Sequence, residues 1–415
     1  MSQHPSSLPL PIRAMNRIGH MLDSMGISPI KLKGEELLSK AAKETGLNDF
    51  GDDSFREPME LLLSSLRDEG QLNMMGRMIA KNDVLRLLKT RLEIVDTLKR
   101  NPEICEQEIA PPLFVIGPPR TGTTVFHDLL ACDPDNRVPL SWETSRPCPP
   151  PEAASYRTDA RIAQNQAELD QVDKLVPDFK KMHPMGAERA QECVAFTSLQ
   201  FTSMIFDVQY RVPSYEDWTN TADVTAMFKF HRQFLQLLQW KHPGKRWALK
   251  SPQHLWHLEA LLKEYPDALI VQTHRDPVKV LVSIASLIAT LRHLGSDHID
   301  LNDIASHYAD WLANAFEHTI SVRERGLLSS RQVIDIQFQE FVKDQVGCVQ
   351  RAYRHFNLPM TSEISSAMQS FIDKNPADKH GKHLYQFSDT GLNLDEVRQR
   401  FQAYEDYFSV QREIN

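Results

Sequence analysis

Apolar residues along the chain follow two patterns, short buried runs and helical repeats. Four short runs predict buried strands: Leu113–Ile116, Arg246–Lys250, Ala268–Thr273 and Gln332–Ile336. Residues of about 156–175, 185–205, 222–240, 302–325 and 342–356 are typical of helices, as are segments that follow Lys250 and Pro277. Short strands alternating with helices predict an α/β fold, with a mostly parallel sheet covered on both faces.

The N-terminal quarter has a purely helical pattern. We expect an irregular lead over residues 1–30, followed by helices from Lys33 to Lys99 that are separated near Gly46, Gly51 and Gly70. We therefore divide the chain into residues 1–107, a helical layer packed on the main domain, and residues 108–415, the main domain. A substrate lid or a dimer surface is the alternative role for this layer.

Composition narrows the class of protein. The 415 residues are 41% hydrophobic and 25% charged, with a net charge of −8, which argues against a nucleic-acid partner. Five scattered cysteines without a C-x-x-C pair favour a reducing compartment, without a disulfide framework or zinc site. The longest apolar stretch, about 278–291, is too short for a membrane span and contains Lys279. A cytoplasmic location without a transmembrane segment is the expectation.

The loop after Ile116 is the main candidate for chemistry. Gly117 and Gly122 have the spacing of a nucleotide-binding P-loop, but Thr123 stands where the P-loop lysine belongs, and the cation is Arg120 inside the loop. Backbone N–H groups of residues 121–124, at the start of a helix, favour a tetrahedral anion. The hydroxyls of Thr121, Thr123 and Thr124 add hydrogen-bond donors. The loop predicts a phosphate or sulfate cradle that is not built for ATP.

Two further cations follow predicted strands. Lys250 begins the sequence Lys-Ser-Pro, and Arg275 lies in His-Arg-Asp-Pro, eight residues before Ser283. Because ligands of parallel sheets gather at the carboxyl ends of strands, Arg120, Lys250 and Arg275 are expected to share one edge. Together they predict a ligand with phosphates at two separated places.

These motifs resemble those of the sulfotransferases that use 3′-phosphoadenosine-5′-phosphosulfate (PAPS). Pro119-Arg-Thr-Gly-Thr-Thr124 is similar to the motif that binds the 5′-phosphosulfate, and Arg275 with Ser283 is similar to the motif for the 3′-phosphate. A bacterial group with PRTGTT, LKSP and HRDP signatures, related to tyrosylprotein sulfotransferases, is the nearest resemblance, over about residues 108–410. It implies a P-loop-like three-layer fold, PAPS as co-substrate without a metal, and transfer to a hydroxyl or amine.

The resemblance also implies roles for individual residues. Arg120 would lie beside the transferring group, Lys250 would approach the leaving phosphate oxygen, and Glu143 would be the acceptor base. Glu188, Glu192, His183 and His127 are the competing bases. The cofactor-binding set is Arg120, Thr121, Gly122, Thr123, Thr124, Arg275, Ser283, Lys379, Lys382 and Tyr385. Phe338 departs from the family, where tyrosine often follows the last core strand.

The acceptor is expected to be a small, lipophilic alcohol or phenol, because the helices over 156–240 are rich in aromatic side chains. Two rival functions remain open. A P-loop kinase or nucleotidase would need the missing lysine and magnesium. A non-catalytic scaffold that binds the product nucleotide PAP would keep the fold without transfer. A homodimer is also left open.

Overall fold

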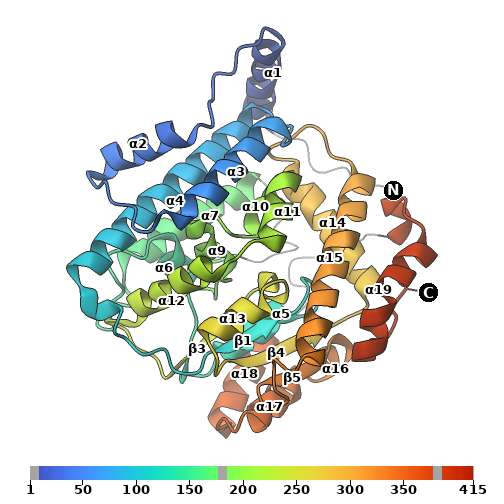
Figure 1. Cartoon of the computed structure of the whole chain (residues 1–415). Helices are drawn as coiled ribbons and strands as arrows, with labels where there is room; N and C mark the ends of the chain where they lie inside the picture. Colours follow the sequence, from blue (N-terminus) through green and yellow to red (C-terminus); the bar gives the residue numbers. More distant parts are fainter. Residues whose placement is uncertain (1–8, 176–184, 377–385, 415) are drawn as a thin grey trace.

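One five-stranded parallel sheet organises the chain (Figure 1). The computed structural model describes residues 9–175, 185–376 and 386–414. Within these residues the sheet has the order β2-β3-β1-β4-β5, and all neighbouring strands run parallel. The strands are β1 (Leu113–Ile116), β2 (Asn136–Arg137), β3 (Arg246–Lys250), β4 (Leu269–His274) and β5 (Val333–Gln337). The predicted α/β fold is confirmed, and β2 is the strand that the sequence pattern did not reveal.

Helices form the rest of the described fold. In chain order they are α1 (Leu10–Ser24), α2 (Gly34–Thr45), α3 (Arg56–Asp68), α4 (Met74–Arg100), α5 (Thr123–Leu130), α6 (Ser141–Ser145), α7 (Ala160–Leu175), α9 (Val194–Thr197), α10 (Ile205–Gln209), α11 (Pro213–Thr221), α12 (Thr225–Gln239), α13 (Leu258–Glu264), α14 (Pro277–Arg292), α15 (Leu301–Glu324), α16 (Phe338–Lys343), α17 (Gln345–His355), α18 (Ser362–Lys374) and α19 (Leu394–Phe408).

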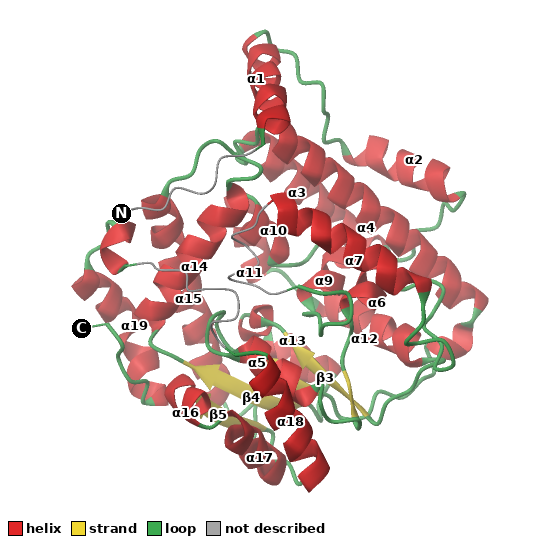
Figure 2. Ribbon diagram, turned by 180° about the vertical axis from the view of Figure 1, so that it is seen from behind, coloured by secondary structure: helices red, strands yellow, loops and turns green. Residues whose placement is uncertain are grey.

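The alternating side chains of β1 separate two hydrophobic cores. Phe114 and Ile116 belong to the larger core, which includes side chains of α12, α13 and α15. Leu113 and Val115 belong to the smaller core with α5, α17 and α18, and Figure 2 shows α5 and α18 lying across the strands. The three-layer arrangement follows from this alternation. The larger core also contains Leu88 of α4, so the N-terminal helices pack on the α/β part, while the boundary at residue 107 stays a prediction.

Two local predictions were wrong. The lead over residues 1–30 contains α1, which stands out from the body in Figures 1 and 2. The expected helix over 185–205 is instead an irregular segment, followed by α9, a short 3-10 turn and α10, with Phe201 at φ 53°. Tertiary hydrogen bonds replace helical ones there, since the Tyr215 hydroxyl accepts from Ser203 N at 3.0 Å and Gln253 Oε1 from Met204 N at 3.3 Å.

The end of β4 is clamped to the C-terminal segment through Asp276. Its carboxylate accepts from Arg398 at 2.7 and 2.9 Å and from the backbone N–H groups of Glu413 and Ile414. Burial alone would raise the pKa of Asp276, but these hydrogen bonds outweigh it and hold the pKa below its usual value. The carboxylate therefore stabilises the fold above its unfolded-state pKa, and that contribution is lost as pH falls through the lower folded-state pKa.

Replacing Asp276 with asparagine is expected to lower the free energy of unfolding at pH 7 by about 3 kcal/mol, because a buried ion pair loses one partner. The loss should shrink as pH falls below roughly 4. Urea unfolding at several pH values measures both effects. Asp310→Asn is the matched control, since Asp310 is 65% exposed in its pair with Arg400 and should cost under about 1 kcal/mol. Equal losses in the two variants would contradict the clamp.

Candidate active site

The carboxyl ends of β1, β3 and β4 lie side by side because β1 sits between the other two strands. This edge brings together the loop over residues 117–122, Lys250 and Arg275. The three strand ends therefore share one edge of the sheet, as expected, while their function as one site stays a prediction.

The loop after β1 is held in an unusual backbone conformation. Gly117, Arg120 and Gly122 have φ values of 147°, 71° and 89°. The Thr121 hydroxyl donates to the Pro118 carbonyl oxygen at 2.7 Å and lies 2.6 Å from the Thr273 hydroxyl of β4. Helix α5 begins directly afterwards at Thr123. The N-terminus of α5 and its loop thus form a preorganised cradle of backbone N–H groups, whose chemistry fits an anion.

Gly117→Ala is expected to destabilise the protein by at least about 2 kcal/mol. A Cβ at this position would lie 2.1 Å from Thr273 Oγ1 and 2.8 Å from the Thr273 carbonyl oxygen, in addition to the strained φ. Gly26→Ala is the control, since Gly26 has φ 72° with nothing within 4 Å of the added Cβ. Chemical denaturation of both variants separates steric contact from backbone strain, and equal losses would refute the contact.

Arg120 and Ser283 are in direct contact. Arg120 Nε donates to Ser283 Oγ at 3.0 Å, and the Arg120 carbonyl oxygen accepts from Arg275 Nη1 at 2.9 Å. Arg275 also forms a two-point ion pair with Glu413 at 2.7 and 2.8 Å. Ser283 and Arg275 thus both contact Arg120 of the loop, and Arg275 also contacts the C-terminal segment. A phosphate at Arg275 would compete with the Glu413 carboxylate.

Phe338 explains part of this placement. The Arg275 guanidinium lies over the Phe338 ring, 3.8 Å from its centre. A small cavity of about 100 Å³ adjoins this stack, and Arg275, Phe338 and Glu413 are among its lining residues. Phe338 thus makes a cation–π contact with Arg275 and offers no hydroxyl group at this position.

Lys250 joins β3 to the start of α5 and to a carboxylate. Its side chain is 3% exposed, forms an ion pair with Glu192, and donates to Thr124 Oγ1 at 3.3 Å. The segment carrying Glu192 is held against β3 because Cys193 N donates to the Lys250 carbonyl oxygen at 2.9 Å. The fold thus places one buried cation and one carboxylate beside the anion cradle.

Glu143 lies in different surroundings from those expected of an acceptor base. Its side chain is fully buried and accepts from Arg137 Nη2 at 2.7 Å and from Leu140 N at 2.9 Å. Arg137 also donates to the carbonyl oxygens of Leu238 and His242. These contacts fix α6 onto β2 and α12, so Glu143 has an evident structural function, and its role as a base stays a prediction.

The other competing bases are also placed apart from one another. His127 is buried, its Nε2 lies 2.9 Å from the Ala248 carbonyl oxygen, and burial lowers its pKa to about 4. Glu188 is exposed in the irregular segment before α9, so Glu188 and Glu192 do not share a helical face. Glu192 is thus the competing base with a contact at the cradle. His183, Lys379, Lys382 and Tyr385 lie outside the described residues.

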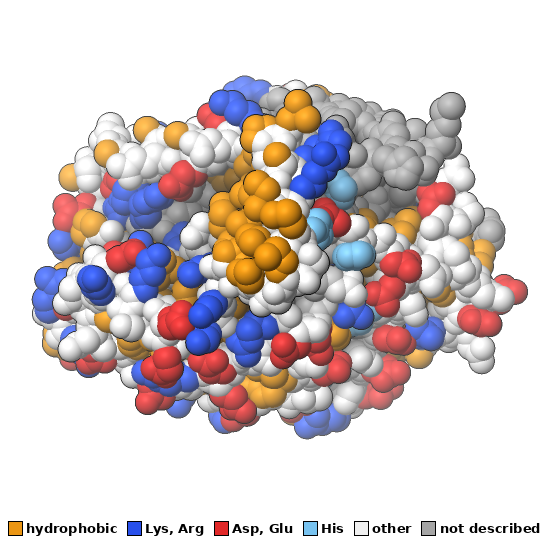
Figure 3. Space-filling view, turned by 90° about the horizontal axis from the view of Figure 1, so that it is seen from above, with side chains coloured by type: hydrophobic (Ala, Val, Ile, Leu, Met, Phe, Trp, Pro, Cys, Tyr) orange, Lys and Arg blue, Asp and Glu red, His pale blue; other side chains and the backbone are white. Residues whose placement is uncertain are grey.

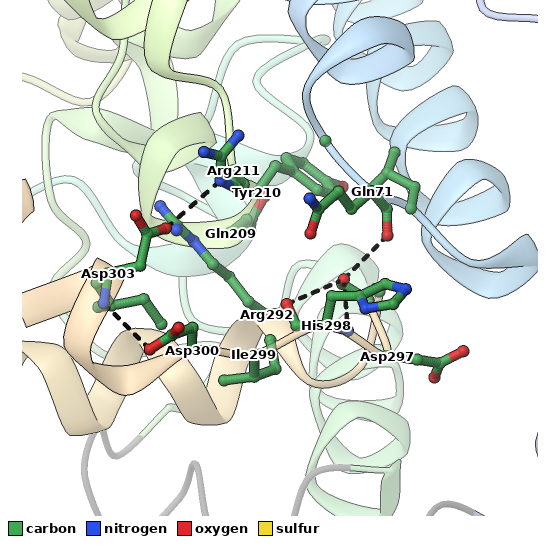
Figure 4. A pocket seen from close by; sticks show the side chains of 15 residues that line it. Gln71, Gln209, Tyr210, Arg211, Arg292, Asp297, His298, Ile299, Asp300 and Asp303 are labelled. Carbon is green, nitrogen blue, oxygen red and sulfur yellow. Dashed lines mark hydrogen bonds and ion pairs between the residues drawn. The ribbon is translucent and has the colours of Figure 1, made fainter. Parts of the chain in front are cut away.

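A larger cavity lies at the far end of α14 (Figure 4). It has a volume of about 520 Å³, and Gln71, Arg211, Arg292, Asp297 and Asp303 are among the residues lining it. A helix rises about 1.5 Å per residue, so Arg292 is roughly 14 Å along α14 from Ser283. Of the predicted site residues that the structure describes, none lines this cavity, and it is separate from the loop over residues 117–122.

Two contributors to the site escaped sequence reasoning. Thr273 anchors the loop through Thr121. Glu413, which lies 138 positions after Arg275 in the sequence, forms an ion pair with it. Thr273 fell inside a predicted strand, and its position at the strand's end was the available signal. Glu413 had no such signal, because it belongs to no motif.

Comparison with known proteins identifies the family. Residues 111–362, more than half of the chain, match the sulfotransferase family, and the chain belongs to it. The solved sulfotransferase STF1 from Mycobacterium tuberculosis is 31% identical, with a TM-score of 0.80 over 89% of this chain and 98% of that one. Sulfotransferase STF9 from Mycobacterium avium is 27% identical, with a TM-score of 0.84 over 94% of this chain and 100% of that one.

One curated relative is named for its acceptor. The omega-hydroxy-beta-dihydromenaquinone-9 sulfotransferase Stf3 of Mycobacterium tuberculosis is 24% identical over 277 residues, which cover 61% of this chain and 65% of the relative. The match thus spans less than two thirds of that relative. In the described part of this chain, no helix is both long and apolar enough to cross a membrane.

Proposed function

We propose that this protein transfers a sulfuryl group from PAPS to a hydroxyl or amine of a small, lipophilic acceptor. The observation that carries the proposal is the meeting of Arg120, Lys250 and Glu192 at the cradle before α5, in a chain of the sulfotransferase family. A cradle that lacks the P-loop lysine and carries its cation, Arg120, inside the loop fits a phosphosulfate better than the triphosphate of ATP. The proposal requires no metal.

Each group around the cradle has a role in this reaction. The backbone N–H groups and the hydroxyls of Thr123 and Thr124 bind the 5′-phosphosulfate, and Arg120 stabilises charge on the transferring group. Lys250 Nζ, held near Thr124, neutralises the phosphate oxygen that leaves. The acceptor oxygen forms a bond to sulfur as the bond from sulfur to the phosphate oxygen breaks, and PAP departs. The acceptor proton passes to a carboxylate.

We assign that carboxylate to Glu192 in preference to Glu143. Glu192 is 16% exposed and lies against Lys250, whereas Glu143 is fully buried against Arg137. A base must reach the acceptor hydroxyl within hydrogen-bond distance, directly or through one water. The partly exposed carboxylate beside the cradle meets that condition more readily.

The 3′-phosphate end involves Arg275 and Ser283, with Lys379, Lys382 and Tyr385 as further proposed contacts. Binding there requires Glu413 to release Arg275, because both oxygens of its carboxylate are engaged with that guanidinium. For the acceptor, an alcohol or phenol on a lipophilic molecule is proposed. The curated relative is itself named for a hydroxylated dihydromenaquinone.

Assays of the full-length protein with sulfur-labelled PAPS and a panel of phenols and lipophilic alcohols test this function. The expected result is labelled sulfate ester formed in the presence of EDTA. Strict dependence on Mg-ATP would overturn the proposal in favour of a kinase or nucleotidase. Tight PAP binding without transfer to any acceptor would favour a scaffold.

A further inference from the structure

Three buried side chains of types that can bind metals meet in the interior of the protein. Cys193 precedes α9, His231 lies on α12, and His254 lies in the 3-10 turn that follows β3. Their ligand atoms all lie within 4.8 Å of one another, and all three side chains are buried. His231 lies 38 positions after Cys193, and His254 lies 23 positions after His231. These separations match no short metal-binding motif, so the sequence pattern does not predict the cluster.

The imidazoles of this cluster are not satisfied by the protein groups around them. His231 Nδ1 lies 2.8 Å from the Tyr265 hydroxyl, but His231 Nε2 and both ring nitrogens of His254 lack a hydrogen-bond partner among the described residues. Buried nitrogens without partners each cost about 1–3 kcal/mol. A ligand that accepts the lone pair of one nitrogen on each ring would remove part of this cost.

The surroundings favour neutral imidazoles. Phe114 packs its ring 5.2 Å from that of His254, and Phe196 packs 4.8 Å from that of His231. Burial lowers the pKa of His231 to about 3 and lowers that of His254 well below its usual value. Burial also raises the pKa of the Cys193 thiol. A neutral imidazole is the form that coordinates metals, and the thiol is deprotonated when a metal binds.

We propose that Cys193 Sγ, His231 Nε2 and one ring nitrogen of His254 bind a single thiophilic d10 metal ion, Cu⁺ or Zn²⁺. Sulfur–metal and nitrogen–metal bonds of about 2.0–2.3 Å imply ligand atoms roughly 3.5 Å apart, so small side-chain rotations would close the cluster. Cu⁺ with one thiolate and two imidazoles is neutral, which suits a dry, three-ligand site. Zn²⁺ would carry one net positive charge and need a fourth ligand.

The consequence of binding is structural. Cys193 follows Glu192 directly, and His254 lies four residues after Lys250, so the ion would tie together the two segments that carry the Glu192–Lys250 pair. Cys193, His231 and His254 are therefore positioning residues for this pair. The Tyr265 hydroxyl orients His231 as an outer partner.

Titration of the purified full-length protein with Cu⁺ or Zn²⁺, under reducing conditions without oxygen, tests the site. The expected result is one bound ion per chain, release of about one proton from the thiol, and a rise in Tm. X-ray absorption of the loaded wild-type protein should show one sulfur and two nitrogen ligands. The metal that saturates the site at one equivalent per chain is identified as the ion that the site binds.

Cys193→Ser and His254→Gln should each abolish the rise in Tm, whereas Cys348→Ser, at a buried cysteine on α17, should retain it. Substoichiometric binding, or identical binding by Cys193→Ser, would overturn the proposal. The absorption measurement on the wild-type protein keeps it falsifiable if a variant fails to fold.

A separate observation concerns α1, which carries an apolar stripe on its outer side. Leu10, Ile18 and Met21 are 76%, 52% and 58% exposed, at spacings that place them on one helical face, and Met25, which follows the helix, is 64% exposed. The opposite face holds the buried residues Ile12, Asn16 and Gly19. Figure 3, which looks down on this end of the molecule, shows hydrophobic side chains gathered into one ridge with basic side chains near it.

Polar contacts hold α1 on the body by its inner side. Asn16 Oδ1 accepts from Met75 N at 3.1 Å, Asp23 pairs with Arg77 at 2.6 Å, and His20 Nε2 lies 2.7 Å from Asp297 Oδ2. The outward direction of the stripe is therefore set by anchored contacts on the other face.

We infer that this stripe docks the protein on an anionic lipid surface. Arg13 and Arg17 are exposed and flank the stripe on one side, so the helix offers apolar side chains to the acyl boundary and guanidinium groups to anionic headgroups. This is the arrangement of a helix that lies in a membrane interface. Independently of the proposed reaction, docking would bring the protein to lipophilic molecules held in that surface.

Sedimentation with vesicles of phosphatidylcholine and phosphatidylglycerol tests the docking. Ile18→Ser with Met21→Ser should weaken vesicle binding by at least about tenfold. Leu327→Ser with Val342→Ser, at exposed apolar residues elsewhere, should leave it unchanged. No binding by the wild-type protein would overturn the inference. So would a dimer that only the stripe variant loses, because that result assigns the stripe to a second copy of this chain.

Discussion

Replacing Arg120 with glycine is expected to lower kcat/KM for sulfuryl transfer by about 100- to 1,000-fold, the usual effect of removing one charge-stabilising donor. The fold should remain at least as stable. Arg120 adopts φ 71°, a conformation that costs a non-glycine residue about 1–2 kcal/mol and glycine almost nothing. Transfer kinetics with labelled PAPS, together with denaturant unfolding, measure the two quantities on the same variant.

Arg120→Lys sharpens the result. It keeps the charge but loses the planar fork, and Nε no longer meets Ser283 at 3.0 Å. We expect an intermediate activity. Arg56→Ala is the control for removing an arginine elsewhere, since Arg56 forms an exposed pair with Asp53. Turnover by Arg120→Gly at the wild-type rate would exclude Arg120 from the reaction and leave its strained conformation without a functional explanation.

Glu192→Gln is expected to lower kcat by about 100- to 10,000-fold, the range typical of a lost general base. PAP affinity should persist. Because Glu192 also pairs with Lys250, a pH profile is needed to separate proton transfer from positioning. Loss of the acidic limb of the kcat profile in the variant would mark a base. A uniform fall in kcat across pH would instead assign Glu192 to holding Lys250 in place.

Glu143→Gln is the matched comparison for Glu192→Gln. We expect the Glu143 variant to lose stability and keep its turnover rate, whereas the Glu192 variant should lose turnover. In this variant Arg137 keeps its buried charge without the carboxylate partner. The free energy of unfolding should therefore fall by roughly 3–5 kcal/mol. The folded fraction should turn over at the wild-type rate. Loss of transfer with unchanged stability and PAP affinity would restore Glu143 as the base and refute the assignment to Glu192.

The sequence predicted those parts of the candidate site whose residues are adjacent in the chain. The strand–loop–helix around Arg120 could be predicted because Leu113–Ile116, the two glycines and the threonines follow one another directly. The parallel order of the sheet followed from strands alternating with helices. The helix predicted over 185–205 was wrong because residues distant in the sequence decide this segment. Side chains from α11 and from the turn after β3 bond the backbone N–H groups of Ser203 and Met204.

The pairing of charges could not be predicted in the same way. The family resemblance pointed to Glu143, but the packing of β2 against α6 brings Arg137 to that carboxylate as a buried partner. Glu192 was one of several carboxylates until the irregular segment before α9 docked on the carbonyl oxygen of Lys250. Tertiary packing decides whether a carboxylate is buried and which cation it pairs with. The sequence pattern gives only the residue type.

By itself the sequence determined four of the five described strands and the strand–loop–helix that carries Arg120, because the conformation of these segments depends on neighbouring residues. The tertiary structure decided the partners of those groups. Arg120 meets Ser283 across 163 positions, Arg275 meets Glu413 across 138, and Cys193 meets two histidines from separate elements. Such contacts arise when strands and helices pack, since burial brings together side chains that no local pattern relates.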